Sequence, residues 1–158
     1  MRLALDQARD AAARDEAPIG CVIAHDGVVI ATAGNRRERD RDPLAHAEVL
    51  AIREAARVLG RWRLTGCTMY VTLEPCTMCA GAIVLARPDR VVYGADDPKA
   101  GAVRSLYRVL EDERLNHAPI VERGVLAEEC GAILSDFFRA KRERTKASDD
   151  PSKLNHDL

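Results

Sequence analysis

The chain has 158 residues, of which 47% are apolar, so its length and composition predict one domain with an ordinary hydrophobic core. Its 24 Lys and Arg nearly balance 25 Asp and Glu, and the formal net charge of −1 argues against a protein that coats nucleic acid. Five cysteines, an odd number, and the lack of a basic start followed by a long apolar run predict a cytoplasmic protein with no signal peptide, disulfide framework or membrane span.

The N-terminal third predicts one helix followed by a hairpin. Residues 2–14 place Leu5, Ala8 and Ala12 on one stripe, which is typical of an amphipathic helix. Residues 19–24 and 28–33 are β-branched runs joined by Asp26-Gly27, a strong signal for a tight hairpin turn. Residues 34–43, rich in alternating charges, are predicted to form a loop.

The remaining chain alternates strands and helices. Apolar spacing and a following Gly60 predict a helix over residues 45–59, and Pro75 is expected at the first position of a helix that runs to about residue 85. A final helix is predicted over residues 127–144, and strands over residues 68–73, 91–93 and 120–122. The long connection before the last strand predicts parallel pairing. We therefore expect a three-layer α/β/α domain around a mixed sheet of about five strands.

Beyond residue 144 the composition becomes polar, with almost nothing to bury. We expect the folded domain to span residues 1–146 and residues 147–158 to form a disordered polar tail.

Two short segments contain residues typical of metal sites: His46-Ala47-Glu48 and Pro75-Cys76-Thr77-Met78-Cys79. Taken alone, His46 is typical of a helix cap or surface residue. The Cys-x-x-Cys pair alone is equally compatible with a redox pair, half of a metal site or two buried thiols. The two segments together, each at the start of a predicted helix, favour a shared metal site.

One His and two Cys provide three ligands for zinc and leave a fourth position for water. Residues two apart on a helix point about 200° from each other. His46 and Glu48 can therefore share a site only if His46 precedes the first full turn, which the nearby Pro43 supports. We expect Cys76 in the first turn of its own helix, so the ion lies between two helix N-termini that keep both cysteines as thiolates.

Glu48 is the candidate proton carrier. A carboxylate beside the bound water can take its proton and deliver it to a leaving group. A glutamate in the first turn of a helix is also favoured simply by the helix dipole.

The combination H-x-E with P-C-x-x-C resembles the zinc-dependent nucleobase deaminases of the cytidine and deoxycytidylate deaminase superfamily. The stretch VTLEPCTMCAGA is more narrowly similar to bacterial tRNA-specific adenosine deaminases. Further similarities are Asn35 and the stretches DPKAG from Asp97, LNH from Leu115 and LSDFFR from Leu134, so the resemblance covers nearly the whole chain.

The resemblance implies a cytidine deaminase-like fold and conversion of the wobble adenosine of a tRNA anticodon to inosine. It implies one Zn²⁺ per subunit held by His46, Cys76 and Cys79, with Glu48 as the proton shuttle. Asn35 would line the nucleoside pocket and Asp97 would lie beside it. The family forms homodimers in which the anticodon stem-loop is contacted partly across the interface.

Two features depart from the family pattern. The chain starts about ten residues later than its relatives usually do, and Arg104 stands where the family commonly has Gly. We expect the Arg104 side chain to point to solvent rather than to a phosphate.

RNA contacts are predicted at the C-terminal helix. Five basic residues against Glu143 give residues 138–146 a local charge of +4, which suits phosphate contacts as well as an ordinary solvated helix end. Phe137 and Phe138 lie about 100° apart on a helix, so one can enter the core while the other flanks a base. Phe138 and Arg142 are our candidate substrate contacts.

Two alternatives stay open at this stage. The same zinc chemistry serves deaminases of a free base or nucleoside, of guanine or cytosine type, and a zinc-containing RNA-binding subunit would need no catalysis. Glu48 argues against the second alternative, because a purely structural site does not need it. The remaining cysteines, Cys21, Cys67 and Cys130, are predicted to pack in the core.

Overall fold

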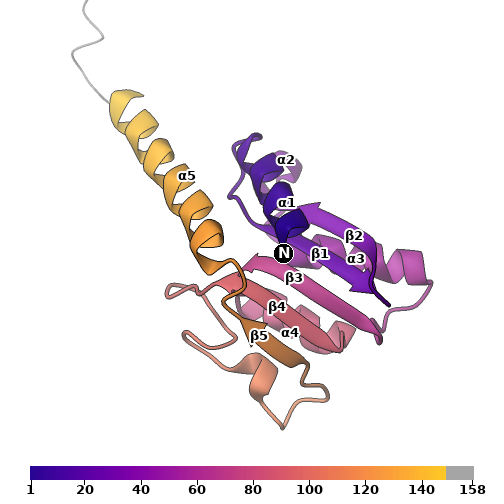
Figure 1. Ribbon diagram of the computed structural model, residues 1–158. Helices are drawn as coiled ribbons and strands as arrows, with labels where there is room; N and C mark the ends of the chain where they lie inside the picture. The colour runs from indigo at the N-terminus through magenta and orange to yellow at the C-terminus, as the bar shows by residue number, and fades with distance from the viewer. Residues whose placement is uncertain (149–158) are drawn as a thin grey trace, which may run out of the picture.

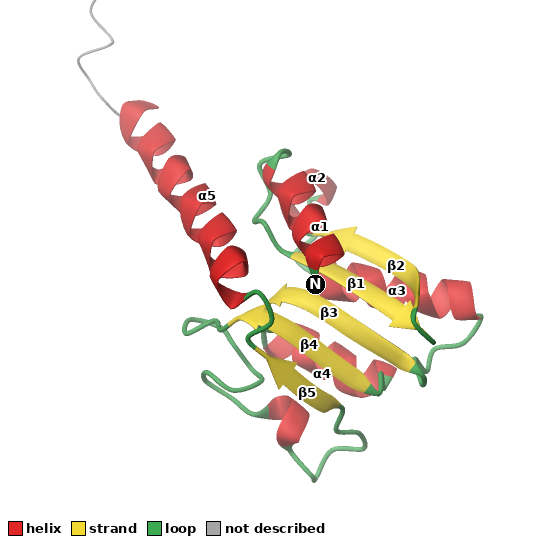
Figure 2. Ribbon diagram, viewed as in Figure 1, coloured by secondary structure: helices red, strands yellow, loops and turns green. Residues whose placement is uncertain are grey.

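The computed structural model describes residues 1–148, which form one five-stranded sheet with helices on both faces (Figures 1 and 2). In chain order the elements are α1 (Arg2–Ala12), β1 (Gly20–His25), β2 (Val28–Gly34), α2 (Arg37–Asp40), α3 (Ala47–Leu59), β3 (Cys67–Leu73), α4 (Thr77–Ala86), β4 (Arg90–Ala95), the 3₁₀ helix η1 (Val109–Glu111), β5 (Ile120–Arg123) and α5 (Ala127–Ser148).

The sheet is mixed, with the strand order β2-β1-β3-β4-β5. The Asp26-Gly27 turn, with positive φ at both residues, joins β1 and β2 as the predicted hairpin, and β1 also pairs antiparallel with β3. From β3 onward the pairing is parallel, so the predicted parallel pairing of the last two strands is confirmed. Parallel pairing places the carboxyl ends of β3, β4 and β5 at one edge of the sheet.

The helices form two layers, as predicted for an α/β/α domain (Figure 1). Helices α1 and α5 contact one face of the sheet, and α3 contacts the other, where α4 lies beside α3 and places Ala80 and Ile83 in the core cluster. Three alanines of α3, Ala47, Ala51 and Ala55, are fully buried in the core cluster. Their small side chains let the α3 backbone approach the strands closely, which fixes the start of α3 near the sheet edge.

Helix α1 packs against glycine on the opposite face. A Cβ atom at Gly20 would lie 1.9 Å from the Ala4 carbonyl oxygen, so this crossing of α1 over β1 requires glycine. The buried face of α1 is correspondingly small, with Ala4, Ala8 and Ala11 beside Leu5.

The predicted loop of residues 34–43 contains a short helix, α2, so this prediction was wrong. The buried Glu16 carboxylate accepts hydrogen bonds from the backbone N–H groups of Glu38 and Arg39 at 3.2 and 2.8 Å. Arg36 also pairs with Asp40 across the helix at 2.9 Å. The local sequence could not indicate this helix, because the carboxylate that holds it lies more than twenty residues earlier.

Several element ends differ from the prediction. Helix α3 begins at Ala47 instead of residue 45, because His46 has extended backbone angles. Helix α5 continues to Ser148, four residues past its predicted end, so residues 147–148 are helical rather than part of the predicted tail. The rest of the predicted tail, residues 149–158, lies outside the described residues.

No helix within residues 1–148 is long and apolar enough to cross a membrane.

Tyr93 on β4 is fully buried, and its hydroxyl has no hydrogen-bond partner among the described residues. We predict that Tyr93→Phe leaves the free energy of unfolding unchanged or raises it by up to about 1 kcal/mol, because a buried unsatisfied hydroxyl is lost. Urea denaturation at neutral pH measures this. A loss of stability by 1 kcal/mol or more would show that the hydroxyl has a favourable partner.

The same residue predicts a pH effect. Burial raises the pKa of Tyr93 from 10.0 to about 12. The Tyr93 hydroxyl ionises at a lower pH in the unfolded chain than in the folded protein, so the free energy of unfolding falls as pH rises from about 10 to about 12. The free energy of unfolding of Tyr93→Phe should fall less over this range. Tyr70→Phe, at a half-buried tyrosine, is the control.

Candidate metal centre and active site

A cavity of about 680 Å³ opens where β3 and β4 end and α3 and α4 begin. Ligand sites in open α/β sheets commonly lie at the carboxyl ends of parallel strands, and this volume suits a small ligand. Chain segments from both helical layers contribute to the walls. The lining includes Asn35, Arg37, His46, Glu48, Glu74, Cys76, residues 95–100, Phe138 and Arg142.

The predicted metal ligands come together at the base of this cavity. His46 Nδ1 lies 3.7 Å from Cys76 Sγ and 3.5 Å from Cys79 Sγ. The possible ligand atoms of these three residues all lie within 4.8 Å of one another. The two predicted motifs therefore form one group that could hold a metal ion.

Extended backbone just before each helix produces this convergence. His46 is the N-cap of α3, with φ −77° and ψ 147°, so its side chain and that of Glu48 reach the same site as expected. Cys76 is likewise the N-cap of α4, with φ −74° and ψ 176°.

The predicted start of α4 was therefore wrong. Pro75 is not the first helical residue and Cys76 is not in the first turn. Cys76 forms an antiparallel bridge with Gly101, and the Ala102 N–H donates to the Pro75 carbonyl at 2.8 Å. This pairing keeps residues 75–76 extended, so α4 begins at Thr77, two residues later than the position of Pro75 indicated.

Hydrogen bonds among the three ligand side chains shift their pKa values in different directions. Hydrogen bonds from Cys79 and His46 lower the pKa of the Cys76 thiol to about 4, although burial opposes this. The hydrogen bond with Cys76 and burial raise the pKa of Cys79, and hydrogen bonding to Cys76 raises the pKa of His46. The expectation that both cysteines are thiolates thus needs a bound cation, because two adjacent negative charges repel each other.

Glu48 lies beside the ligands with a free oxygen. Its side chain is 3% exposed and lines the cavity, and Oε2 has no hydrogen-bond partner among residues 1–148. Burial raises the pKa of this carboxyl group, so it holds a proton more readily than an ordinary glutamate. A buried carboxyl group with one unpartnered oxygen and a raised pKa is suited to proton transfer in this cavity.

Asn35 and Asp97 both line the cavity, and each also accepts hydrogen bonds from backbone N–H groups. Asn35 Oδ1 accepts the Ala47 N–H at the start of α3 at 2.8 Å, which leaves its amide N–H group for other contacts. Asp97 Oδ1 accepts the N–H groups of Lys99 and Ala100 at 3.0 and 3.2 Å.

Helix α5 contributes Phe138 and Arg142 to the cavity wall. Of the two adjacent phenylalanines, Phe137 is half-buried and Phe138 is 40% exposed. The two rings stack edge to face, with 5.3 Å between their centroids. The structure thereby answers which ring faces the cavity: Phe138 does.

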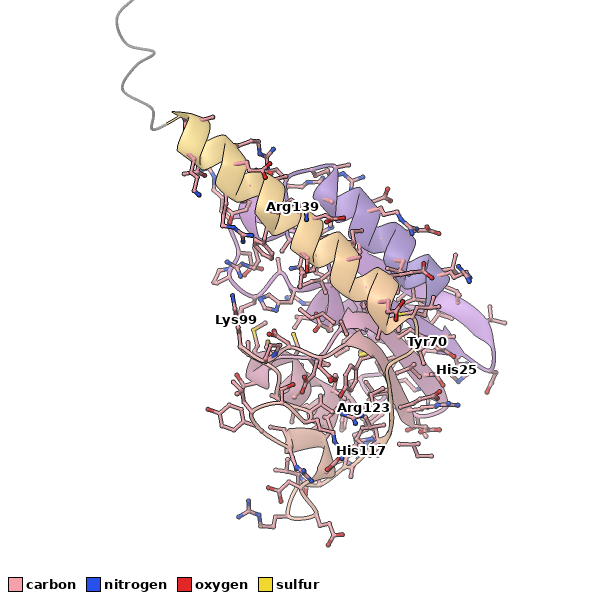
Figure 3. All side chains as sticks on the ribbon, turned by 60° about the vertical axis from the view of Figure 1, so that its left-hand side comes forward. His25, Tyr70, Lys99, His117, Arg123 and Arg139 are labelled. Carbon is pink, nitrogen blue, oxygen red and sulfur yellow. The ribbon has the colours of Figure 1, made fainter. Side chains whose placement is uncertain are left out.

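The basic charge of α5 is partly neutralised. Lys141 and Arg144 contact Asp15 at 3.8 and 2.6 Å, and Arg139, labelled in Figure 3, pairs with Asp136 at 2.7 Å. The local charge of +4 predicted from residues 138–146 therefore overstates the charge available to a ligand.

The sequence analysis did not single out several residues that line the cavity, and among the charged ones are Arg37, Lys99 and Glu74. Arg37 and Lys99 are two cations among many in the sequence, and no local pattern distinguishes them. The sequence did contain an indication that Glu74 has a role. A carboxylate that directly follows a buried strand and precedes the cysteines needs hydrogen-bond partners.

Other predictions also have an outcome. The exposed Arg104 side chain lies 3.6 Å from Glu111, as expected for a solvent-facing residue. Cys21, Cys67 and Cys130 are free and buried, which confirms their predicted core packing.

Comparisons with known proteins place these residues in context. A family model described as MafB19-like deaminase matches residues 1–142. The tRNA-specific adenosine deaminase of Bacillus subtilis (strain 168) is 51% identical over 148 residues, 94% of this chain and 92% of the relative. That of Agrobacterium fabrum is 53% identical over 142 residues, 90% of this chain and 93% of the relative.

A solved structure also matches the fold. It comes from a study of A-to-I editing by tRNA:A34 deaminases at the wobble position of transfer RNA, and it superimposes with a TM-score of 0.82 at 52% identity. The match covers 85% of this chain and 97% of the other. Together these comparisons confirm the resemblance drawn from the two motifs.

The contact between Asn35 and Ala47 predicts a structural cost at this site. Asn35→Ala leaves the buried Ala47 N–H without its acceptor and should lower the free energy of unfolding by about 2 kcal/mol. Asp42→Ala, which removes a solvent-exposed 2.8 Å bond to the Leu44 N–H, should cost about 0.5 kcal/mol. Denaturant titrations of both variants measure this, and equal costs would contradict the capping role.

Proposed function

The chain belongs to the MafB19-like deaminase family, and we propose that it is a hydrolytic deaminase that converts adenosine to inosine at the wobble position of a tRNA anticodon. One observation carries this function: an imidazole and two thiols that could hold a metal ion lie together beside a cavity, which is also lined by a buried glutamate with one unpartnered oxygen. The relatives, about half identical to this chain and named tRNA-specific adenosine deaminases, support the substrate.

We propose zinc as the metal, one ion per chain. Zinc binds Cys sulfur at about 2.3 Å and His nitrogen at about 2.0 to 2.1 Å, so two such ligands at a tetrahedral angle lie about 3.6 Å apart. The His46 to thiol distances of 3.5 and 3.7 Å fit this geometry. The donor set also fits, since imidazole and thiolates leave the fourth position to water.

Bound zinc would lower the pKa of a water molecule and make it nucleophilic near neutral pH. Glu48 then takes a proton from the attacking water, which adds to carbon 6 of adenine, and delivers it to ring nitrogen 1. Glu48 would then take the proton of the hydroxyl group on carbon 6 and deliver it to the exocyclic amine, so that ammonia leaves and the carbonyl group of inosine forms. One water is consumed, and adenosine becomes inosine.

The cavity walls support the proposed substrate contacts. The free amide N–H group of Asn35 can bind the nucleoside, with Asp97 beside it, and the exposed ring of Phe138 can stack on a base. The cation Arg142 lines the same cavity and can contact phosphate. An anticodon loop suits this site, because its bases are already partly unstacked.

A homodimer and a cytoplasmic location complete the proposal. The layer formed by α3 and α4 exposes apolar side chains, including Val58 at 48% and Leu85 at 72%, which a second copy could cover. Five free cysteines suit a reducing compartment.

The decisive experiment incubates the zinc-loaded protein with an anticodon stem-loop that carries a wobble adenosine. We expect inosine at that position, detected by sequencing, and loss of rate by about 10³-fold in Glu48→Gln, which cannot carry the proton. No conversion at stoichiometric enzyme would refute the function. Ammonia released from free guanine, cytosine or a nucleoside, with none from RNA, would favour a small-molecule deaminase instead. An unchanged rate in Glu48→Gln would refute the proton-shuttle role.

The metal assignment predicts a separate result. Cys76→Ser should hold well below one zinc per chain and melt at a lower temperature, near that of the chelator-treated protein, because metal binding is coupled to folding. Cys67→Ser, at a buried thiol outside the site, should keep its zinc. Full zinc occupancy in Cys76→Ser, measured by elemental analysis, would refute the ligand role.

A further inference from the structure

The Glu74 carboxylate holds two distant parts of one loop. Glu74 is 2% exposed, and its Oε1 accepts the backbone N–H groups of Val103, Arg104 and Ser105 at 3.1, 2.7 and 2.9 Å. Its Oε2 accepts the Asp97 N–H at 2.9 Å and the Ser105 hydroxyl. Four backbone amides and one hydroxyl therefore depend on a single buried side chain.

The loop held in this way forms part of the cavity wall. Residues 96–100 all line the cavity, and the Lys99 side chain projects from this segment (Figure 3). Within the loop, the Gly101 N–H donates to the Asp97 carbonyl at 2.8 Å. The loop contains no helix or strand between Asp96 and Leu106, so the contacts to Glu74 replace a regular hydrogen-bond ladder.

The loop held by Glu74 also contacts the chain segment that contains Cys76, one of the predicted metal ligands. Glu74 directly precedes Pro75 and Cys76, and Cys76 forms an antiparallel bridge with Gly101 of the loop. A Cβ atom at Gly101 would lie 2.3 Å from Glu74 Oε2, so the loop backbone packs tightly on the carboxylate. The bridge to Gly101 and the contacts with Glu74 therefore fix the position of this part of the cavity wall relative to Cys76.

We propose that Glu74 is a positioning residue for substrate binding: it holds residues 96–101 at a fixed place beside the metal-binding segment. It does not touch the reacting atoms, and it acts through the loop that lines the cavity. The inference rests on the proposed function for the identity of the substrate. That Glu74 fixes the loop is inferred only from its hydrogen bonds and does not depend on the identity of the substrate.

The test compares three variants with the unsubstituted protein. Glu74→Gln keeps the shape but replaces one acceptor oxygen with an amide N–H group, which faces backbone donors. Ser105→Ala removes only the hydroxyl and keeps the backbone bonds, so it remains informative if Glu74→Gln does not fold. Asp89→Asn is the matched control, because Asp89 accepts the Gly66 N–H at 3.0 Å at the opposite end of the sheet.

Steady-state kinetics on the anticodon stem-loop, well below the melting temperature, give the main result. Glu74→Gln should raise KM about tenfold and Ser105→Ala about threefold, with kcat and zinc content little changed, because the loop binds substrate but does not carry the chemistry. Asp89→Asn should leave both constants unchanged. A purely structural role would lower the melting temperature without moving KM.

Amide hydrogen exchange without substrate gives an independent readout. Residues 97 and 103–105 should exchange faster in Glu74→Gln, while the amides of β3 and β4 keep their protection. An unchanged KM in both Glu74→Gln and Ser105→Ala overturns the proposal, as does a loss confined to kcat. If Glu74→Gln does not fold, Ser105→Ala decides alone. If the unsubstituted protein does not deaminate the RNA, the proposed function fails, and hydrogen exchange still decides whether Glu74 fixes the loop.

Discussion

The approach of the His46 imidazole to the Cys76 and Cys79 thiols, at 3.5 to 3.7 Å, is the constraint on which the rest of the structure depends. It requires the starts of α3 and α4 to meet, with extended backbone at both N-caps. Buried alanines bring α3 close to the sheet, and the parallel β3 and β4 end at the same edge. The core thus serves to bring two chain segments thirty residues apart to one point.

Much of this fold could be predicted from local sequence patterns. Alternating β-branched residues, the Asp26-Gly27 turn and Gly60 after α3 marked the strands, the hairpin and a helix end, because each feature acts on its immediate neighbours. The errors lie where a distant residue decides. Helix α2 depends on Glu16, and the late start of α4 depends on pairing with Gly101. No window of neighbouring residues contains those partners.

In the candidate site, too, residues with a local sequence pattern could be predicted and those with distant partners could not. His46, Cys76 and Cys79 were identifiable because their residue types and spacing suit one ion. The position of Glu74 after a buried strand indicated that it needs partners, but the sequence could not identify them, because they are backbone amides 23 to 31 residues later. Asn35 lines the cavity, and its bond to Ala47 shows that a residue at a pocket can also hold the start of the helix next to the predicted metal ligand His46.

The pairing of Asp15 with Lys141 and Arg144 ties the end of α1 to the distal half of α5. A phosphate that contacts these two side chains must displace a carboxylate instead of a loosely held counterion. Such an exchange of one anion for another releases fewer salt ions to solution than contact with an unpaired cation. Under the proposed function, RNA binding along this helix is expected to depend less steeply on ionic strength than the number of its basic residues would suggest, and the carboxylates of Asp15 and Asp136 account for that difference.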